Sequence, residues 1–290
     1  MTRVLAFCAA VILSAITVSS ACIATPVAPL NFRLSADSGS RVQLSLFHDD
    51  RRHNSVNSSS FAAADLPGVD IAALRQTIQR QVRFALVREA GRVDCAGIGG
   101  SASATGHCIF TPDPAFAAFL ESRGIGRPTA EQSFDLAMVG ASRDLVEALA
   151  ANHYPRGDIE KLTELAAVGV DRRFVTDLAT RGHAPATLDD LVEFAALNIS
   201  PAYIDSLAEA GYRNLSADQI AQLAALHITP DFIQGFARIG YANLPVETLV
   251  ELKALDVTPA FVRSLEQHGI RPASAEKLAE LKAVGIEGLK

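Results

Sequence analysis

The chain has 290 residues, enough for two domains or for one domain and a repeat array, and its formal net charge is −6. Aromatic residues make up only 6% of the sequence and Trp is absent, which suits closely packed short helices better than an aromatic-lined pocket. Residues 113–290 carry 25 acidic and 16 basic side chains, whereas residues 1–112 carry 7 and 10. Because an acidic surface repels phosphate backbones, this charge argues against a nucleic acid partner.

Residues 1–24 have the pattern of a secretory signal peptide. An Arg near the start precedes an apolar run of about a dozen residues, and small residues follow, with cleavage expected after Ala21 or Ala24. A membrane anchor needs a longer apolar run of roughly 20 residues, and no later segment qualifies, so we expect an exported chain in the periplasm or outside the cell. A lipid anchor at Cys22 is the alternative, although a lipoprotein signal would place a Leu-like residue where this chain has Ser19.

Residues 25–112 are predicted to form a small antiparallel β domain with one short helix. Runs with partial alternation of apolar and polar residues predict strands at residues 31–36, 41–47, 82–87, 92–97 and 106–110. The polar stretch 48–60, rich in Ser and Asn, is predicted to be a mobile loop. Apolar residues at helical spacing predict the helix between Val69 and Gln79.

Two cysteines near the end of the β domain are suitably spaced for a bond across a hairpin. Cys95 and Cys108 are equidistant from a turn centred between Ser101 and Ala102, so this register would place them directly opposite each other. Export would supply an oxidising compartment, and we favour a disulfide over two separate buried thiols. A catalytic thiol is disfavoured, because alternation points the neighbouring base, His107, to the opposite face.

From Asp113 onwards the sequence repeats with a period of 29 residues. The anchors in register are Leu162, Leu191, Ile220, Leu249 and Leu278, then Leu165, Phe194, Leu223, Leu252 and Leu281, and an aromatic set of Phe174, Tyr203, Phe232 and Phe261. A fixed period in this range is typical of a stacked array. We therefore predict an α+β fold in which residues 113–290 form an α-solenoid of about six helix pairs, with Phe232 among its buried anchors.

Each unit is predicted to contain two short helices with recognisable ends. The first helices should begin near residues 130, 159, 188, 217, 246 and 275, and the second near 114, 143, 172, 201, 230 and 259. Ser, Thr or Asp stands at the capping position before nearly every one, often followed by Pro at the first position of the second helix. Gly, Asn, His or Asp follows each helix, and these residue types tolerate positive φ.

One surface feature also repeats, two residues after the first anchor of each unit and on the face away from the core. We call it the acidic ladder: Asp135, Glu164, Glu193, Gln222, Glu251 and Glu280. Repeated polar residues usually form a solvated face, and that is the first interpretation. The functional alternative is a groove for a basic peptide or for cations.

The sequence contains no recognisable catalytic constellation. The seven His residues form no HExxH or paired His/Cys spacing, and GxSxG, P-loop and GxGxxG motifs are absent. We therefore expect a non-enzyme without a cofactor or a metal site. A hydrolase with an unrecognised site is the less favoured alternative.

The segment VRFALVREAGRV, a short hairpin, FTPDPAF and units such as LVELKALDVTPAFVRSLEQHGI together show a family resemblance. This arrangement resembles the extracytoplasmic C-terminal region of some bacterial membrane metallopeptidases of the β-lactam-sensor, antirepressor type, and similar regions of stand-alone secreted proteins. It covers roughly residues 31–290, and since the peptidase module is missing, no catalytic residue carries over. The resemblance implies a bacterial envelope protein with a sensing or interaction role.

These observations favour an exported interaction module that binds a protein or a peptide through its repeat surface. The competing hypothesis is an accessory regulator of a membrane peptidase or of an envelope sensor.

Overall fold

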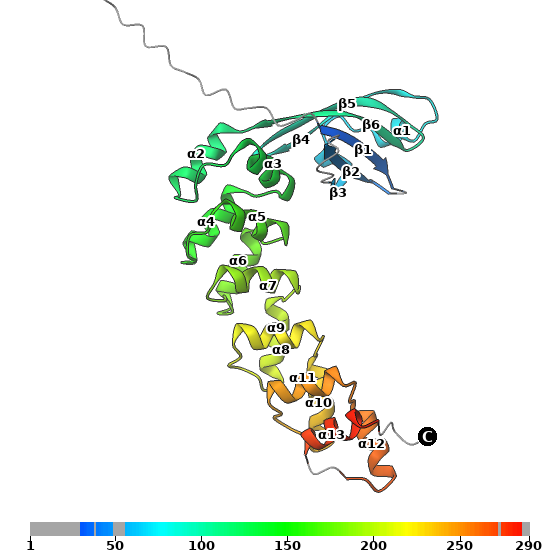
Figure 1. Ribbon diagram of the computed structural model, residues 1–290, viewed down its shortest axis with the longest axis vertical. Coiled ribbons are helices and arrows are strands. Elements are labelled where there is room, and N and C mark those ends of the chain that lie inside the picture. The colour runs from blue at the N-terminus through cyan, green and yellow to red at the C-terminus, as the bar shows by residue number, and fades with distance from the viewer. Residues whose placement is uncertain (1–29, 38, 49–55, 272–273, 286–290) are drawn as a thin grey trace, which may run out of the picture.

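The computed structural model describes residues 30–37, 39–48, 56–271 and 274–285. The fold is α+β: a six-stranded antiparallel sheet stands at one end, and a curved column of helices extends away from it (Figure 1). The predicted signal peptide and Cys22 lie outside the described residues. Within the described ranges, no helix combines the length and the apolar character needed to cross a membrane.

The sheet has the spatial order β3-β2-β1-β6-β5-β4. Its strands are β1 (Leu30–Ala36), β2 (Arg41–His48), β3 (Val56–Ala62), β4 (Arg80–Arg88), β5 (Gly91–Gly100) and β6 (Ser103–Pro112). Side chains alternate between the two faces, so that Phe32, Leu44 and Phe84 are buried on the same side. Five strands match the sequence prediction closely, and the sixth, β3, does not.

The predicted loop at residues 48–60 is wrong where the structure describes it, because residues 56–60 belong to β3. This strand lies at an edge of the sheet and is rich in Ser. Its hydroxyls bond to side chains of β2: Gln43 Nε2 donates to Ser58 Oγ at 2.7 Å, and Arg41 Nε donates to Ser60 Oγ at 3.0 Å. An edge strand that bonds its neighbour through hydroxyls needs few apolar residues, and its sequence therefore resembles a loop.

The helix predicted over Val69–Gln79 is also wrong in length, since α1 spans only Ile71–Leu74 after a short 3₁₀ turn, η1, at Ala63–Asp65. The carbonyl of Leu74 accepts from the N–H of Ala102 at 2.9 Å, at the tip of the β5–β6 hairpin. Bonds to the hairpin thus replace the bonds that would continue the helix.

The β5–β6 hairpin has the register predicted from the sequence. Cys95 pairs directly with Cys108, and the two form a disulfide with Cα atoms 4.1 Å apart. The turn residues Ser101 and Ala102 have φ values of 54° and 63°, as a two-residue turn between twisted strands requires. His107 is exposed on the other face of the strand, as predicted.

Beyond the sheet, the described chain contains twelve helices of eight to ten residues. They are α2 (Pro114–Ser122), α3 (Ala130–Val139), α4 (Arg143–Ala151), α5 (Ile159–Ala167), α6 (Arg172–Thr180), α7 (Leu188–Ala196), α8 (Pro201–Glu209), α9 (Ala217–Ala225), α10 (Pro230–Ala237), α11 (Val246–Ala254), α12 (Pro259–Gln267) and α13 (Ala275–Ala283). Each begins at the residue that the sequence predicts.

Capping explains this agreement. The N-cap side chain accepts a backbone N–H at every one of these helices except α11, where Pro245 has no side chain that can do so. The residue types predicted after each helix all have positive φ, including the non-glycine residues His153, Asn198, His227 and Asp256. Local signals therefore define the helix boundaries.

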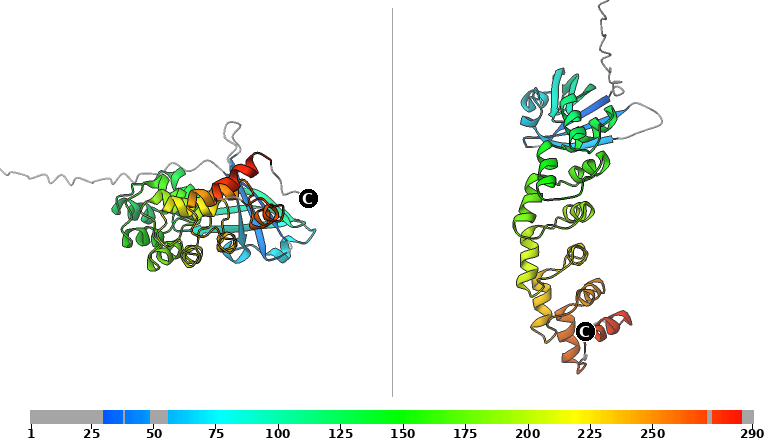
Figure 2. Two further views of the ribbon diagram at one scale, coloured as in Figure 1. Left: turned by 90° about the horizontal axis from the view of Figure 1, so that it is seen from below. Right: turned by 90° about the vertical axis from the view of Figure 1, so that its left-hand side faces the viewer.

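The helices form two files that lie side by side (Figure 2). Contacts run along the odd-numbered file from α3 to α13 and along the even-numbered file from α4 to α6 and from α8 to α12. The odd-numbered file joins the sheet through α3, where the ring of Phe134 packs edge-on against the ring of Phe110 with centroids 5.3 Å apart. One apolar core thus runs from the sheet into the helices across the predicted boundary at residues 112 and 113.

The prediction that Phe232 is a buried anchor is wrong in degree. Of the aromatic set, only Phe261 is buried, whereas Phe174, Tyr203 and Phe232 are half-buried. The second helix of each unit buries the residues one and four positions after its aromatic residue. In α10, where the aromatic residue is Phe232, these are Ile233 and Phe236. The repeated aromatic rings therefore lie at the margin of the core, where one face can meet solvent or another side chain.

Candidate interaction surface

All six residues of the acidic ladder are exposed, as predicted. They lie on the odd-numbered file, one on each of α3, α5, α7, α9, α11 and α13. Because consecutive helices of this file contact one another, the ladder follows the long axis of the array. The ladder is therefore a feature of one file of helices and extends over its whole length.

Lysines neutralise parts of the ladder. Lys161 forms ion pairs with Glu164 of the same helix and with Asp189 of α7, the latter at 2.6 Å. The hydrogen bonds that Lys161 donates to Asp189 and then to Glu164 raise the pKa of Lys161, so the lysine is positively charged at neutral pH. Lys277 pairs with Glu280 in the same way near the end of the array. Between these two lysines the ladder continues through Glu193, Gln222 and Glu251.

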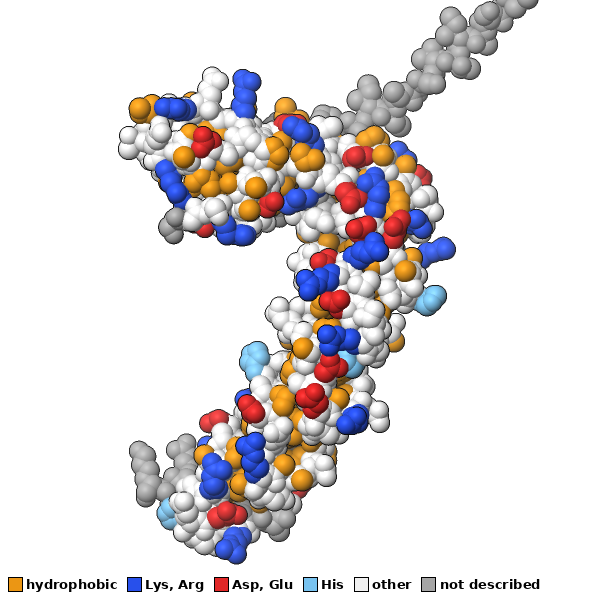
Figure 3. All heavy atoms as spheres, turned by 180° about the vertical axis from the view of Figure 1, so that it is seen from behind, with side chains coloured by type: hydrophobic (Ala, Val, Ile, Leu, Met, Phe, Trp, Pro, Cys, Tyr) orange, Lys and Arg blue, Asp and Glu red, His pale blue; other side chains and the backbone are white. Residues whose placement is uncertain are grey.

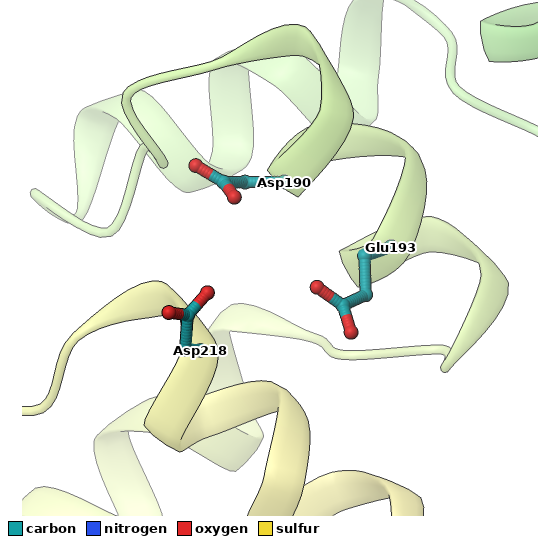
Figure 4. Close-up of side chains that lie close together, drawn as sticks. All are labelled: Asp190, Glu193 and Asp218. Atoms are coloured by element: carbon teal, nitrogen blue, oxygen red, sulfur yellow. The ribbon is translucent and has the colours of Figure 1, made fainter.

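Three carboxylates gather in that interval, and we call them the acidic cluster: Asp190 and Glu193 on α7, and Asp218 on α9. One oxygen from each lies within 4.8 Å of the others. Figure 4 shows the three side chains directed toward a common space between the two helices. Glu193 and Asp218 are exposed and Asp190 is half-buried.

The sequence identified Glu193 but missed its two partners. Asp218 lies in the first turn of α9, where an acidic residue suits the helix dipole and needs no further explanation. The available signal was spacing: Asp190 precedes Glu193 by three residues, one helical turn, and Asp218 stands one unit after Asp189. Stacking of neighbouring units turns these separate positions into one cluster.

The chemistry of the acidic cluster is the attraction of positive charge. Three carboxylates at this separation repel one another, and a cationic side chain placed among them would relieve that repulsion. Carboxylate oxygens also suit hard metal ions, but exposed acidic groups commonly occur without one. The expectation of no metal site stays a prediction.

A second ionic group links the even-numbered file and was not predicted. His183 Nε2 and Asp205 Oδ1 of α8 lie 2.8 Å apart, and Arg181 donates to the other oxygen of Asp205 at 2.6 Å. The hydrogen bonds from His183 and then Arg181 lower the pKa of Asp205, which stays ionised. This group connects two successive units, and its charges satisfy one another.

On the face opposite to that of Figure 1, acidic and basic side chains are interspersed along the array (Figure 3). The acidic excess of residues 113–290 is thus not spread as one continuous patch on this face.

Comparisons with known proteins find no matching family model and no matching curated protein.

Proposed function

We propose that this chain is an exported, non-enzymatic interaction module whose helix pairs form a solenoid. In such an array each unit contacts only its neighbours, which leaves long faces free for a partner. The Cys95–Cys108 disulfide supports export, since such bonds persist in oxidising compartments. The resemblance to the extracytoplasmic region of sensor-type membrane metallopeptidases agrees with a role in the bacterial envelope.

The observation that carries the proposal is the acidic cluster around the ladder residue Glu193. Asp190, Glu193 and Asp218 converge on the odd-numbered file without a lysine among them, whereas Glu164 and Glu280 have one. This arrangement favours a basic segment of a protein or peptide as the ligand, because complementary charge guides association and fixes orientation. The odd-numbered file is therefore the proposed binding face.

Site-specific cross-linking tests this proposal. A photoreactive amino acid replaces Glu193 in the mature protein, and a matched variant carries it at Ala260, an exposed position on α12 in the even-numbered file. The proposal expects a protein of a bacterial envelope extract to cross-link at position 193 and not at position 260. Added salt should reduce the yield of the product at position 193. The same products at both positions, or none at position 193, would contradict it.

A further inference from the structure

In the last two units of the array, a lysine lies over the aromatic ring of the repeat. Lys253 Nζ lies 5.0 Å from the ring centroid of Phe232, and Lys282 Nζ lies 5.1 Å from that of Phe261. In both pairs the lysine follows its ring by 21 residues and comes from the next helix of the odd-numbered file. These distances are those of cation–π interactions. The array thus has a built-in position for a cation over each ring.

At Phe174 the same position is occupied by Ala195, which is too short to cover the ring. A hollow of about 470 Å³ opens there, lined by Phe174 and Ala195 together with Asn198 and Pro201 from the turn into α8. The next unit also has an alanine, Ala224, at this position, but there the aromatic residue is a tyrosine whose hydroxyl donates to the carbonyl of Ile228. The hollow at Phe174 is therefore the space that a lysine fills in the last units.

The charges around the hollow suit a cation. Asp171 and Asp177 both line it, and together they outnumber the one lining cation, Arg173, which lies 3.4 Å from Asp177. The N-termini of α6 and α8 also border the hollow and carry partial positive charge. Lys253 lies over the ring of Phe232 although the N-termini of α10 and α12 stand in the equivalent places there. Helix N-termini in this arrangement therefore do not prevent a cation from lying over the aromatic ring.

We propose that the hollow at Phe174 binds a lysine or arginine side chain of a basic peptide segment, with the cation over the ring as in the Lys253–Phe232 pair. The inference rests on the proposed interaction function and adds a specific subsite to it. The partner supplies the positive charge that Ala195 lacks, and the carboxylates of Asp171 and Asp177 hold the cation from the side.

The test uses a capped Gly-Lys-Gly-Lys-Gly peptide and the same peptide with norleucine in place of both lysines. Titration of the isotope-labelled mature protein is followed by NMR, with the amides around Phe174 as the reporter. Ala195→Lys places a lysine of the protein itself over the Phe174 ring. It should therefore compete with the lysine peptide and weaken its binding about tenfold. Ala224→Lys adds the same charge one unit further on, and should leave the affinity within about twofold.

Three outcomes would overturn the inference. Equal weakening by the two lysine variants would mean that only overall charge matters, and equally tight binding of the norleucine peptide would mean that the hollow selects apolar side chains. Absence of any shift near Phe174 would also refute the subsite. If the envelope partner still cross-links at position 193 in that case, the interaction module stands and only the subsite is wrong.

Discussion

The two phenylalanines of α10 offer a matched test of how the array is held together. Phe236 is fully buried, whereas Phe232 is half-buried, and their rings pack edge-on with centroids 5.1 Å apart. Phe236→Ala loses about 2 kcal/mol of transfer free energy. A cavity penalty brings the expected loss of unfolding free energy to about 3–5 kcal/mol. Phe232→Ala should cost only about 1–2 kcal/mol, because part of that ring already meets solvent or Lys253.

Both variants lose the same ring–ring contact, so that contact cancels in the comparison. The remaining difference reflects the burial of each ring and the Lys253 contact that only Phe232 makes. Urea unfolding followed by circular dichroism gives the free energies, and hydrogen exchange shows where the structure loosens. We expect Phe236→Ala to release α10 and α12 first while the amides of the sheet stay protected. A cost for Phe232→Ala equal to or above that for Phe236→Ala would refute the assignment of the core.

Four further predictions concern individual side chains or a single bond. Tyr212→Phe should cost about 0.5–1.5 kcal/mol, because the Tyr212 hydroxyl donates to a carbonyl of the next unit at 2.6 Å. Tyr154→Phe, two repeat periods earlier, should be neutral or stabilising in the same denaturation assay, because the buried Tyr154 hydroxyl has no hydrogen-bond partner among the described residues. Replacing Cys95 and Cys108 together by Ser should cost about 3 kcal/mol, and the unreduced protein should show neither as a free thiol by alkylation and intact mass. Glu193→Ala should change stability by no more than about 0.5 kcal/mol, since exposed side chains rarely contribute more, and a larger loss would show that Glu193 is structural.

The helix boundaries could be predicted from sequence because each depends on a few neighbouring residues. Thr229-Pro230 begins α10 and His227 ends the preceding turn with positive φ, and neither needs a distant partner. The pairing of Cys95 with Cys108 could be predicted for the same reason, since a two-residue turn fixes which residues of the hairpin face each other.

Features that depend on tertiary contacts could not be predicted from the sequence. The strand β3 is held by its pairing with β2 rather than by an apolar pattern of its own, and α1 stops where Leu74 bonds to the hairpin tip. The acidic cluster needs the offset between stacked units, which a period of 29 residues does not by itself provide. The half-buried state of Phe232 likewise depends on how far neighbouring helices cover its ring.

The most direct test of the interaction module compares two doubly neutralised variants for binding to the envelope protein captured at position 193. One variant carries Glu193→Gln and Asp218→Asn in the acidic cluster, and the control carries Glu209→Gln and Asp231→Asn at exposed positions in the even-numbered file. Both remove two negative charges, so long-range attraction falls equally. We predict that the cluster variant binds at least about tenfold more weakly and that the control binds within about twofold of the unmodified protein. Equal weakening of both variants, or of neither, would contradict the claim that the odd-numbered file is the binding face.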